Sequence, residues 1–223
     1  MRRKSKNRKS KKTMRWLAMG IMTLAALSFS NGLYIQAKAE VAQWLLQDAW
    51  VRTLAGEAQA KPWSWADIWP VASLHYRKQP TSTELFSEEL FSDDHDLLVL
   101  NEASGQGLAF GPGRLASNIQ PGEPGWLIIG GHRDTHFGFL ERVTQGDTIA
   151  LQSTDSRWHL YEVDHIQVVD STNEMLPAPD EISEPGLILV TCYPFDVVSN
   201  GSLRYVVMAK KVQPHDNGRV ITL

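Results

Sequence analysis

The sequence predicts an all-β domain that begins near residue 96. Beyond that position no helical period of any length appears, and short apolar runs alternate with turn signals. Gly and Pro mark the turns, as in Gly111-Pro112-Gly113 and Asn200-Gly201. Many short strands separated by turns predict a closed barrel or a sandwich. The eight apolar runs are 97–100, 108–110, 126–129, 148–151, 158–163, 166–169, 187–190 and 204–209.

The N-terminal segment predicts export through a membrane. Residues 1–15 hold nine Lys or Arg and no acid, whereas the rest of the chain carries 13 basic and 25 acidic residues, a net charge of −12. Residues 16–35 contain no charge, and about twenty residues at ~1.5 Å each span a bilayer core of ~30 Å. Because Lys and Arg stay on the cytoplasmic side, we expect a single-pass anchor at 16–36 in the cell membrane, with everything after it extracytoplasmic.

A cleaved signal peptide is the alternative interpretation, since Ala37-Lys38-Ala39 fits the small-x-small cleavage pattern. The apolar stretch is longer than the usual 7 to 15 residues of such a peptide, which favours an uncleaved anchor. Both interpretations export the domain. The apolar stretch after the basic run also argues against a nucleic-acid-binding arm.

Residues 37–95 are expected to form a helical and Trp-rich linker or lid. A helical stripe ends near Gly56, and it fits a helix that packs on the domain or lies at the bilayer surface. Residues 62–70 contain three tryptophans, which could contact a membrane interface, pack on the barrel or cover the site. Residues 77–96 are polar and acidic, which is typical of a linker. The stripe consists of Ala42, Leu46, Ala49, Trp50 and Leu54.

The candidate catalytic residues stand where three apolar runs meet polar sequence. Cys192, the only cysteine, ends the run 187–190 and precedes Pro194. His132 follows the run 126–129 after two glycines, and Arg204 enters the run 204–209. Each residue alone has an ordinary structural explanation, as a buried thiol, a turn histidine or an ion pair at a strand edge. Together they supply a nucleophile, a proton carrier and a cation, and they predict nucleophilic catalysis.

The residue types assign the roles. Cys192 attacks a peptide carbonyl, because sulfur is the strongly nucleophilic side chain near neutral pH. His132 protonates the leaving amine and later accepts a proton from the incoming nucleophile. Arg204 stabilises the developing oxyanion or orients the substrate backbone through its planar, permanently charged fork. Thr191 is expected to bind substrate or to support the thiol.

Neither a metal nor a cofactor is expected. His132 and His136 have the spacing of two zinc ligands on a helix, but the glutamate of the H-E-x-x-H pattern is missing. A helix is also not expected to begin at two glycines. The segment 93–96 is most simply a solvated turn, and no acidic cluster supports calcium. Arg133 should point away from His132 if that segment is extended, so it is interpreted as structural.

Three segments resemble the signature segments of sortases, the cysteine transpeptidases of bacterial cell surfaces. They are GHRDTHF at 131–137, TCYPF at 191–195 and LRYVV at 203–207. The resemblance extends over residues 96–212, and the Trp-rich segment together with GHRDTHF is most similar to the sortases of proteobacteria. Ile188 departs from the family pattern, which has threonine four residues before the thiol; we expect this change to alter packing only.

The resemblance implies an eight-stranded β-barrel at 96–223 and a thiol peptidase of the hydrolase class. It implies a substrate that is another exported protein with a C-terminal LPxTG-like sorting signal, cleaved between Thr and Gly. Cys192 would hold the threonine as a thioester, and an amine acceptor or water would resolve it. Surface-protein anchoring at the cell membrane follows, with no nucleic-acid partner.

Three alternatives compete with this interpretation. An L,D-transpeptidase also orders His, Cys and Arg on a β-rich domain, but its cysteine lies in a Gly-Cys-x-Arg setting, and here Arg204 comes twelve residues after Cys192. A papain-like or NlpC-like peptidase has its cysteine at a helix start, ahead of its histidine. The chain could also be a non-catalytic, membrane-anchored β-barrel binding module.

Overall fold

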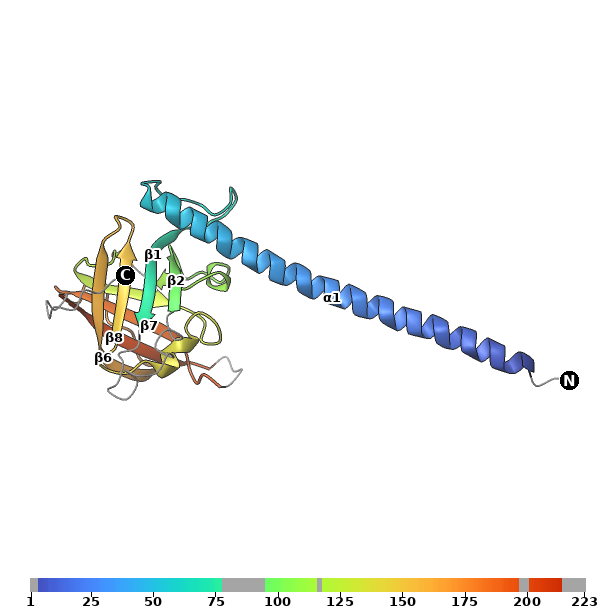
Figure 1. Cartoon of the computed structure of the whole chain (residues 1–223). Coiled ribbons are helices and arrows are strands. Elements are labelled where there is room, and N and C mark those ends of the chain that lie inside the picture. Colours follow the sequence, from blue (N-terminus) through green and yellow to red (C-terminus); the bar gives the residue numbers. More distant parts are fainter. Residues whose placement is uncertain (1–3, 78–94, 116–117, 197–200, 214–223) are drawn as a thin grey trace, which may run out of the picture. The chain divides into compact units, whose positions relative to one another are not determined.

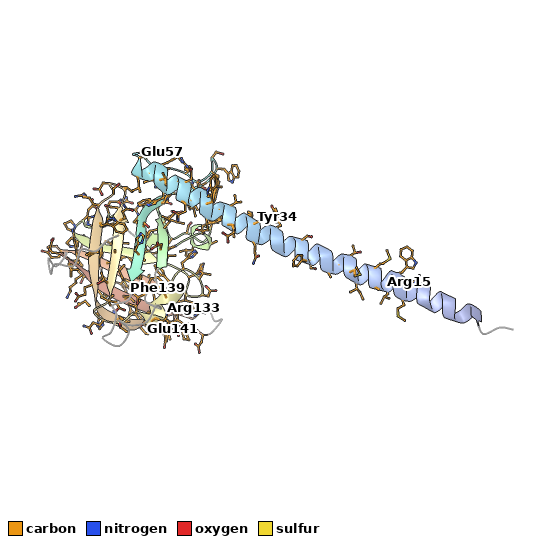
Figure 2. All side chains as sticks on the ribbon, in the orientation of Figure 1. Arg15, Tyr34, Glu57, Arg133, Phe139 and Glu141 are labelled. Carbon is orange, nitrogen blue, oxygen red and sulfur yellow. The ribbon has the colours of Figure 1, made fainter. Side chains whose placement is uncertain are left out.

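The computed structural model describes residues 4–77, 95–115, 118–196 and 201–213 (Figure 1). The side chains of 4–13, 26, 27, 31, 33 and 35 lie outside this description. The chain divides into two compact units, 1–44 and 45–223. Helix α1 (Lys4–Leu54) forms the first unit and continues into the second. Figure 2 shows Arg15 and Tyr34 along this helix.

The predicted membrane anchor at 16–36 lies within α1. Among the residues that the structure describes, no helix is both long and apolar enough to cross a bilayer. The anchor therefore stays a prediction. The predicted linker at 77–96 falls largely on residues 78–94, which lie outside the described part of the chain, as do Asp93 and Asp94.

The end of α1 confirms the helical stripe. Leu46 and Ala49 are fully buried and Trp50 nearly so. The helix ends at Leu54, and Gly56 adopts φ +97° while its N–H donates to the Thr53 carbonyl at 2.9 Å. A glycine with positive φ is the usual residue just beyond a helix C-terminus. The stripe packs into a cluster, called here the helix cluster, of Leu46, Trp50, Ala66, Ile68, Leu98 and Leu100.

Eight strands form a closed barrel, as predicted, in the order β1-β2-β3-β4-β7-β8-β6-β5. The β2–β3 and β4–β7 pairs are parallel, and the other pairs are antiparallel. Two short 3-10 helices, η3 (Gly107–Ala109) and η4 (Gly138–Arg142), lie in the connections. The strands are β1 (Pro70–Arg77), β2 (His95–Leu100), β3 (Gly113–Leu115), β4 (Gly125–Gly130), β5 (Thr148–Ser153), β6 (Trp158–Asp170), β7 (Pro185–Cys192) and β8 (Leu203–Val212).

The individual strands differ from the prediction in four places. The run 108–110 is wrong as a strand: it belongs to η3, where the Leu108 N–H donates to the Ser104 carbonyl at 2.9 Å and closes a turn. The runs 158–163 and 166–169 are one strand, β6, with an irregular register between Val163 and His165. Strands β1 and β3 were not predicted from the sequence. Strand β1 also places part of the barrel before residue 96.

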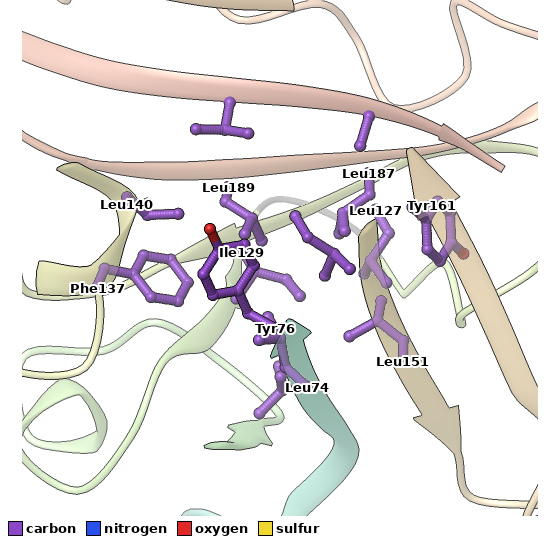
Figure 3. Packing of buried hydrophobic residues seen from close by; sticks show 14 of the residues in the cluster. Leu74, Tyr76, Leu127, Ile129, Phe137, Leu140, Leu151, Tyr161, Leu187 and Leu189 are labelled. Carbon is purple, nitrogen blue, oxygen red and sulfur yellow. The ribbon is translucent and has the colours of Figure 1, made fainter. Parts of the chain in front are cut away.

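The barrel core follows from period-two alternation. Along β4 and β7, Leu127, Ile129, Leu187 and Leu189 point into the barrel (Figure 3). The alternate residues belong to a second cluster on the outer face, called here the outer cluster. A parallel pair that is buried on both faces reads as a continuous apolar run, which is why these strands were visible in the sequence. The outer cluster consists of Trp126, Ile128, Val169, Ile188, Val190 and Val206.

Gly113 sits where a side chain cannot fit. A Cβ built there would lie 2.2 Å from the Glu102 carbonyl oxygen and 2.6 Å from the Ala103 nitrogen, both backbone atoms. We expect Gly113→Ala to lower the free energy of unfolding by about 1–3 kcal/mol, the usual cost of overpacking. Gly105→Ala is the control, because a Cβ there meets nothing within 4 Å. Equal denaturant midpoints for the two variants would contradict the close packing of Gly113 against the backbone of Glu102 and Ala103.

Candidate active site

The parallel pairing of β4 with β7 brings two of the predicted residues to one end of the sheet. The register pairs Gly130 with Val190, and the Gly131 N–H donates to the Val190 carbonyl at 3.2 Å. His132 lies two residues beyond Gly130, and Cys192 lies two residues beyond Val190. Because parallel strands run in the same direction, both residues leave the sheet at the same edge.

The antiparallel pairing of β7 with β8 brings the third predicted residue, Arg204, to the same end of the sheet. Cys192 and Arg204 are direct register partners. Directly opposed residues of an antiparallel pair have their Cα atoms about 4.5–5.5 Å apart and their side chains on the same face. On this face Cys192 follows Ile188 and Val190 of the outer cluster, so the thiol and the guanidinium belong to the outside of the barrel.

The three residues line one groove of about 810 Å³. Its walls are mostly aliphatic and include the buried outer-cluster residues Ile128, Val169 and Val190. Glu174 is the one carboxylate residue among the described residues that line it. The lining consists of Ala103, Leu108, Leu115, Ile128, Gly130, Gly131, His132, Val169, Ser171, Glu174, Met175, Leu176, Pro177, Ala178, Pro179, Val190, Thr191, Cys192 and Arg204.

Thr191 links the histidine segment to the cysteine strand. Its side chain is buried, and its Oγ1 donates to the Gly131 carbonyl at 2.8 Å. With the bond from Gly131 to Val190, two hydrogen bonds fix the residue directly before His132 against the two residues before Cys192. Thr191 also borders the groove, so its predicted contact with substrate stays a prediction beside this observed structural role.

A buried phenylalanine holds the turn that carries His132. The Phe137 N–H donates to the His132 carbonyl at 2.9 Å, and the Phe137 ring is fully buried. A Cβ on Gly131 would lie 2.8 Å from that ring, which explains the glycine at this position. The turn leaves His132 exposed at the groove, whereas Arg133 (Figure 2) is half buried and does not line it.

His136 does not complete a metal site with His132. The segment forms a turn rather than a helix, so the four-residue spacing does not place both rings on one helical face. The described residues include no group of three or more His, Cys, Asp or Glu side chains that could hold a metal ion. Burial lowers the pKa of His136 from its usual value, and the nearby charge of His132 lowers it further.

Arg204 is held beside its own strand. Its Nη1 donates to the carbonyls of Gly201 and Leu203, each at 2.8 Å. The pKa of Asp170 at the end of β6 is lowered chiefly by the Thr172 backbone N–H, with further contributions from the Ser202 hydroxyl and the Arg204 charge. The guanidinium therefore lies among backbone carbonyls and one carboxylate at the rim of the groove.

The chain after Cys192 is fixed by an aromatic cluster. The Tyr193 and Tyr205 rings stack with centroids 6.1 Å apart, and Phe195 meets Tyr205 edge to face at 5.2 Å. The Tyr193 N–H donates to the Leu203 carbonyl at 3.1 Å. Burial is the main cause that raises the pKa of Tyr205. These contacts hold both strands where Cys192 faces Arg204.

One wall of the groove was not predicted from the sequence. Seven lining residues lie between 171 and 179, in the connection from β6 to β7. The Ser171 Oγ donates to the Ser202 carbonyl at 2.7 Å, which ties this connection to the one before β8. The apolar residues 175–179 in this loop, Met175 to Pro179, were the available signal, since apolar residues exposed in a loop commonly mark a binding surface.

The family comparison matches the part of the chain that forms the groove. A family model described as "Sortase domain" matches residues 92–212. Sortase D of Bacillus subtilis (strain 168) is 30% identical over 117 residues, which are 52% of this chain and 58% of that protein. The chain thus spans less than two thirds of the length of this relative.

Solved structures agree on the fold. Sortase A from Corynebacterium diphtheriae has a TM-score of 0.53 and 27% identity, and the match covers 70% of this chain and 67% of that chain. A lid mutant of the same protein has a TM-score of 0.54 at 23% identity, with 82% and 100% covered. A Clostridium perfringens Sortase D5 transpeptidase has a TM-score of 0.52 at 18% identity, with 78% and 99% covered. The last two likenesses show the fold alone.

The electrostatic coupling of the two histidines can be measured directly. Replacing His132 by Asn removes a neighbouring positive charge, so we expect the pKa of His136 to rise, yet to stay below its usual value because burial is the larger cause. An NMR pH titration of the His136 ring checks this. With its folded pKa lowered, His136 opposes folding as the pH falls below the unfolded value of about 6.5. An unchanged or lower pKa in the variant would refute the coupling.

Proposed function

Because the chain belongs to the sortase family, we propose that it is a cysteine transpeptidase that acts on the sorting signals of exported proteins. The observation that carries this proposal is the register pair of Cys192 and Arg204, with His132 at the same edge of the sheet. All three border one open groove. A thiol, a proton carrier and a cation on one surface are the groups that acyl transfer requires.

The first half of the reaction forms a thioester. The Cys192 sulfur, as thiolate, attacks the carbonyl carbon of the scissile peptide bond and forms an S–C bond. The C–N bond breaks, and His132 gives its proton to the departing amine. The acyl part of the signal remains on Cys192.

The second half restores the enzyme. The nitrogen of an incoming amine attacks the thioester carbon, the S–C bond breaks, and the thiolate leaves. His132 accepts the proton that the amine loses, and a new amide bond results. Water in place of the amine gives hydrolysis with the same proton count.

Arg204 stabilises the negative charge that develops on the substrate carbonyl oxygen. In the substrate-free protein its Nη1 donates to two carbonyls of its own strand entry. A tetrahedral oxyanion is a stronger acceptor than a neutral carbonyl, so the guanidinium gains by donating to it in the transition state. The fork geometry lets one nitrogen keep a backbone contact while another contacts the substrate.

The aliphatic groove supports an LPxTG-like signal cleaved between Thr and Gly. Leu108 and Leu115 are half buried and offer apolar surface to the groove, as do Leu176 and Pro177 in the connection from β6 to β7. Leucine and proline side chains bury apolar area on such a surface without leaving polar groups unpaired. The cleavage position itself rests on the family resemblance.

We also propose the cellular location, the sortase type and the class of acceptor. The charge-free stretch 16–35 behind nine basic residues supports a membrane anchor with the barrel outside the cytoplasm. The Trp-rich segment and GHRDTHF support a member of the proteobacterial type. The acceptor is an amine that the sequence does not identify. A binding module that kept the fold without turnover is the alternative, and an acyl-enzyme assay separates the two.

Intact mass spectrometry of the full chain in detergent, mixed with LPxTG-like peptides, tests the reaction. We expect a mass increment equal to the peptide up to its threonine, lost in Cys192→Ala and transferred to added amines such as triglycine or hydroxylamine. His132→Asn should slow product formation by about 10²–10⁴-fold, the usual contribution of a general acid and base. Arg204→Ala should slow it by about 10²–10³-fold, as for loss of an oxyanion donor.

His136→Asn is the matched control for His132→Asn, because it lies in the same turn outside the groove lining. It should keep nearly the activity of the unsubstituted protein. Peptide binding without any adduct or cleavage product would instead support the binding module.

A further inference from the structure

The Trp-rich segment 62–70 does not line the catalytic groove, and ring contacts and hydrogen bonds hold it in place. Trp63 is half buried and meets Phe110 edge to face, with ring centroids 5.4 Å apart. The Trp69 N–H donates to Asn101 Oδ1 at 3.0 Å, and the Asn101 N–H donates to the Trp69 carbonyl at 3.0 Å. Although its neighbours are fixed, Trp65 is 81% exposed.

A second cavity, of about 520 Å³, lies between this segment and the connection from β2 to β3. The indoles of Trp63 and Trp65 and the ring of Phe110 supply its aromatic surface. Asp67 and Glu102 supply two exposed carboxylates, and Ser104 and Gln106 add neutral polar groups. We call this cavity the tryptophan pocket.

The charges of the tryptophan pocket are of one sign. Among the described residues, those that line it include no Lys, Arg or His. The ion pairs that the described part of the chain makes lie elsewhere, so neither Asp67 nor Glu102 is neutralised by one of them. Carboxylates beside exposed indole faces repel anions and attract a cation, which gains both from ion pairing and from the ring quadrupole.

The geometry favours an alkylammonium over a metal ion. A metal site needs several oxygen ligands converging at about 2.0–2.6 Å, and the described residues contain no such group of three acidic or histidine side chains. An alkylammonium has an apolar stem that covers indole surface and a charged head that stays at the solvent edge near the carboxylates. The mixture of aromatic and acidic lining fits that amphipathic shape.

The tryptophan pocket and the catalytic groove share one wall. Ala103 and Leu108 line the groove, whereas Glu102 and Ser104 line the pocket. Gly107 at the centre of this connection is packed tightly, since a Cβ there would meet Ser104 Oγ at 3.1 Å and Ile68 Cγ2 at 3.3 Å. Neighbouring residues of the connection from β2 to β3 therefore line both cavities.

We propose that the tryptophan pocket binds a primary alkylammonium group, of the kind that a lysine side chain or an aliphatic amine carries. Trp63 and Trp65 cover the stem, and Asp67 and Glu102 hold the charge. The site is distinct from the groove and does not depend on turnover at Cys192. It gives a function to the Trp-rich segment, which has no chemical role in the proposed transpeptidation.

The experiment is an NMR titration of the full chain in detergent, followed through the tryptophan indole N–H signals, with Trp63 and Trp65 assigned by substitution. The probe is Nα-acetyl-lysine N-methylamide, and Nα-acetyl-norleucine N-methylamide is the uncharged control of similar length. We expect the lysine derivative to shift the Trp63 and Trp65 signals with a millimolar dissociation constant. The norleucine derivative should shift them at least fivefold less at equal concentration.

Variants assign the site. The double variant Asp67→Asn with Glu102→Gln, and separately Trp65→Ala, should each weaken lysine binding at least fivefold. All three residues are exposed, so these variants are expected to fold, and unchanged circular dichroism and melting temperature verify that. Asp180→Asn is the matched control, an exposed acid on another loop, and should bind as the unsubstituted chain does.

Two results would overturn the proposal: equal shifts with the norleucine derivative, or unchanged binding in the double carboxylate variant. Loss of binding in Asp180→Asn as large as in the double variant would also overturn it, because the attraction would then be unspecific. Pentylamine identifies the source of the group. Tighter binding of the lysine derivative assigns it to a polypeptide, and equal binding shows that a free amine suffices. Cys192→Ala should leave every titration unchanged, which separates this site from the transpeptidase chemistry.

Discussion

The parallel register of β4 on β7 is the constraint on which the candidate site depends. These strands are about sixty residues apart in sequence, and only their pairing puts the residues after Gly130 beside those after Val190. A shift of one residue would turn every side chain of β7 to the other face, moving the Cys192 thiol into the barrel. The register is protected because both faces of the pair are buried. Leu187 and Leu189 fill the core, while Ile188 and Val190 fill the outer cluster.

The groove is a consequence of the same double burial. The outer cluster is formed by residues of β4, β6, β7 and β8, and three of them line the groove. The connection 171–179 lines the groove on one side. Ile128 and Val190 are only 3% and 7% exposed, so the apolar surface that the groove leaves open comes from half-buried residues such as Leu176. In the proposed reaction, a peptide with apolar side chains covers this half-buried surface, and the apolar area removed from water favours its binding.

The sequence revealed what depends on burial and missed what depends on local backbone chemistry. Strands such as 126–129 and 187–190 are continuous apolar runs, and the candidate residues at their ends were predicted from their residue types and from the family resemblance. Strand β3 has three residues, one of them Gly113, and carries no periodicity to read. The run 108–110 is apolar, yet its first two residues belong to η3, because the Gly107 N–H donates to Ser104 Oγ at 3.2 Å and the packing around Gly107 favours a turn. The count of eight strands was nevertheless correct, since two unread strands replaced one false strand and one strand counted twice.

For Arg204, the sequence predicted a cation at the start of a strand but not the hydrogen bonds that its side chain makes. A cation at the start of β8 follows from the sequence, and its position opposite Cys192 follows from the register. Its hydrogen bonds to the Gly201 and Leu203 carbonyls depend on the turn before β8, which no periodic pattern encodes. Those bonds have a chemical consequence. Nη1 already donates to two neutral carbonyls, so moving one of its bonds to a neutral substrate carbonyl gives little binding, because one such bond merely replaces another. The guanidinium gives more binding to an oxyanion, whose charge strengthens the same bond. In the proposed reaction, the resting contacts of Arg204 therefore favour binding of the transition state, where added binding raises the rate.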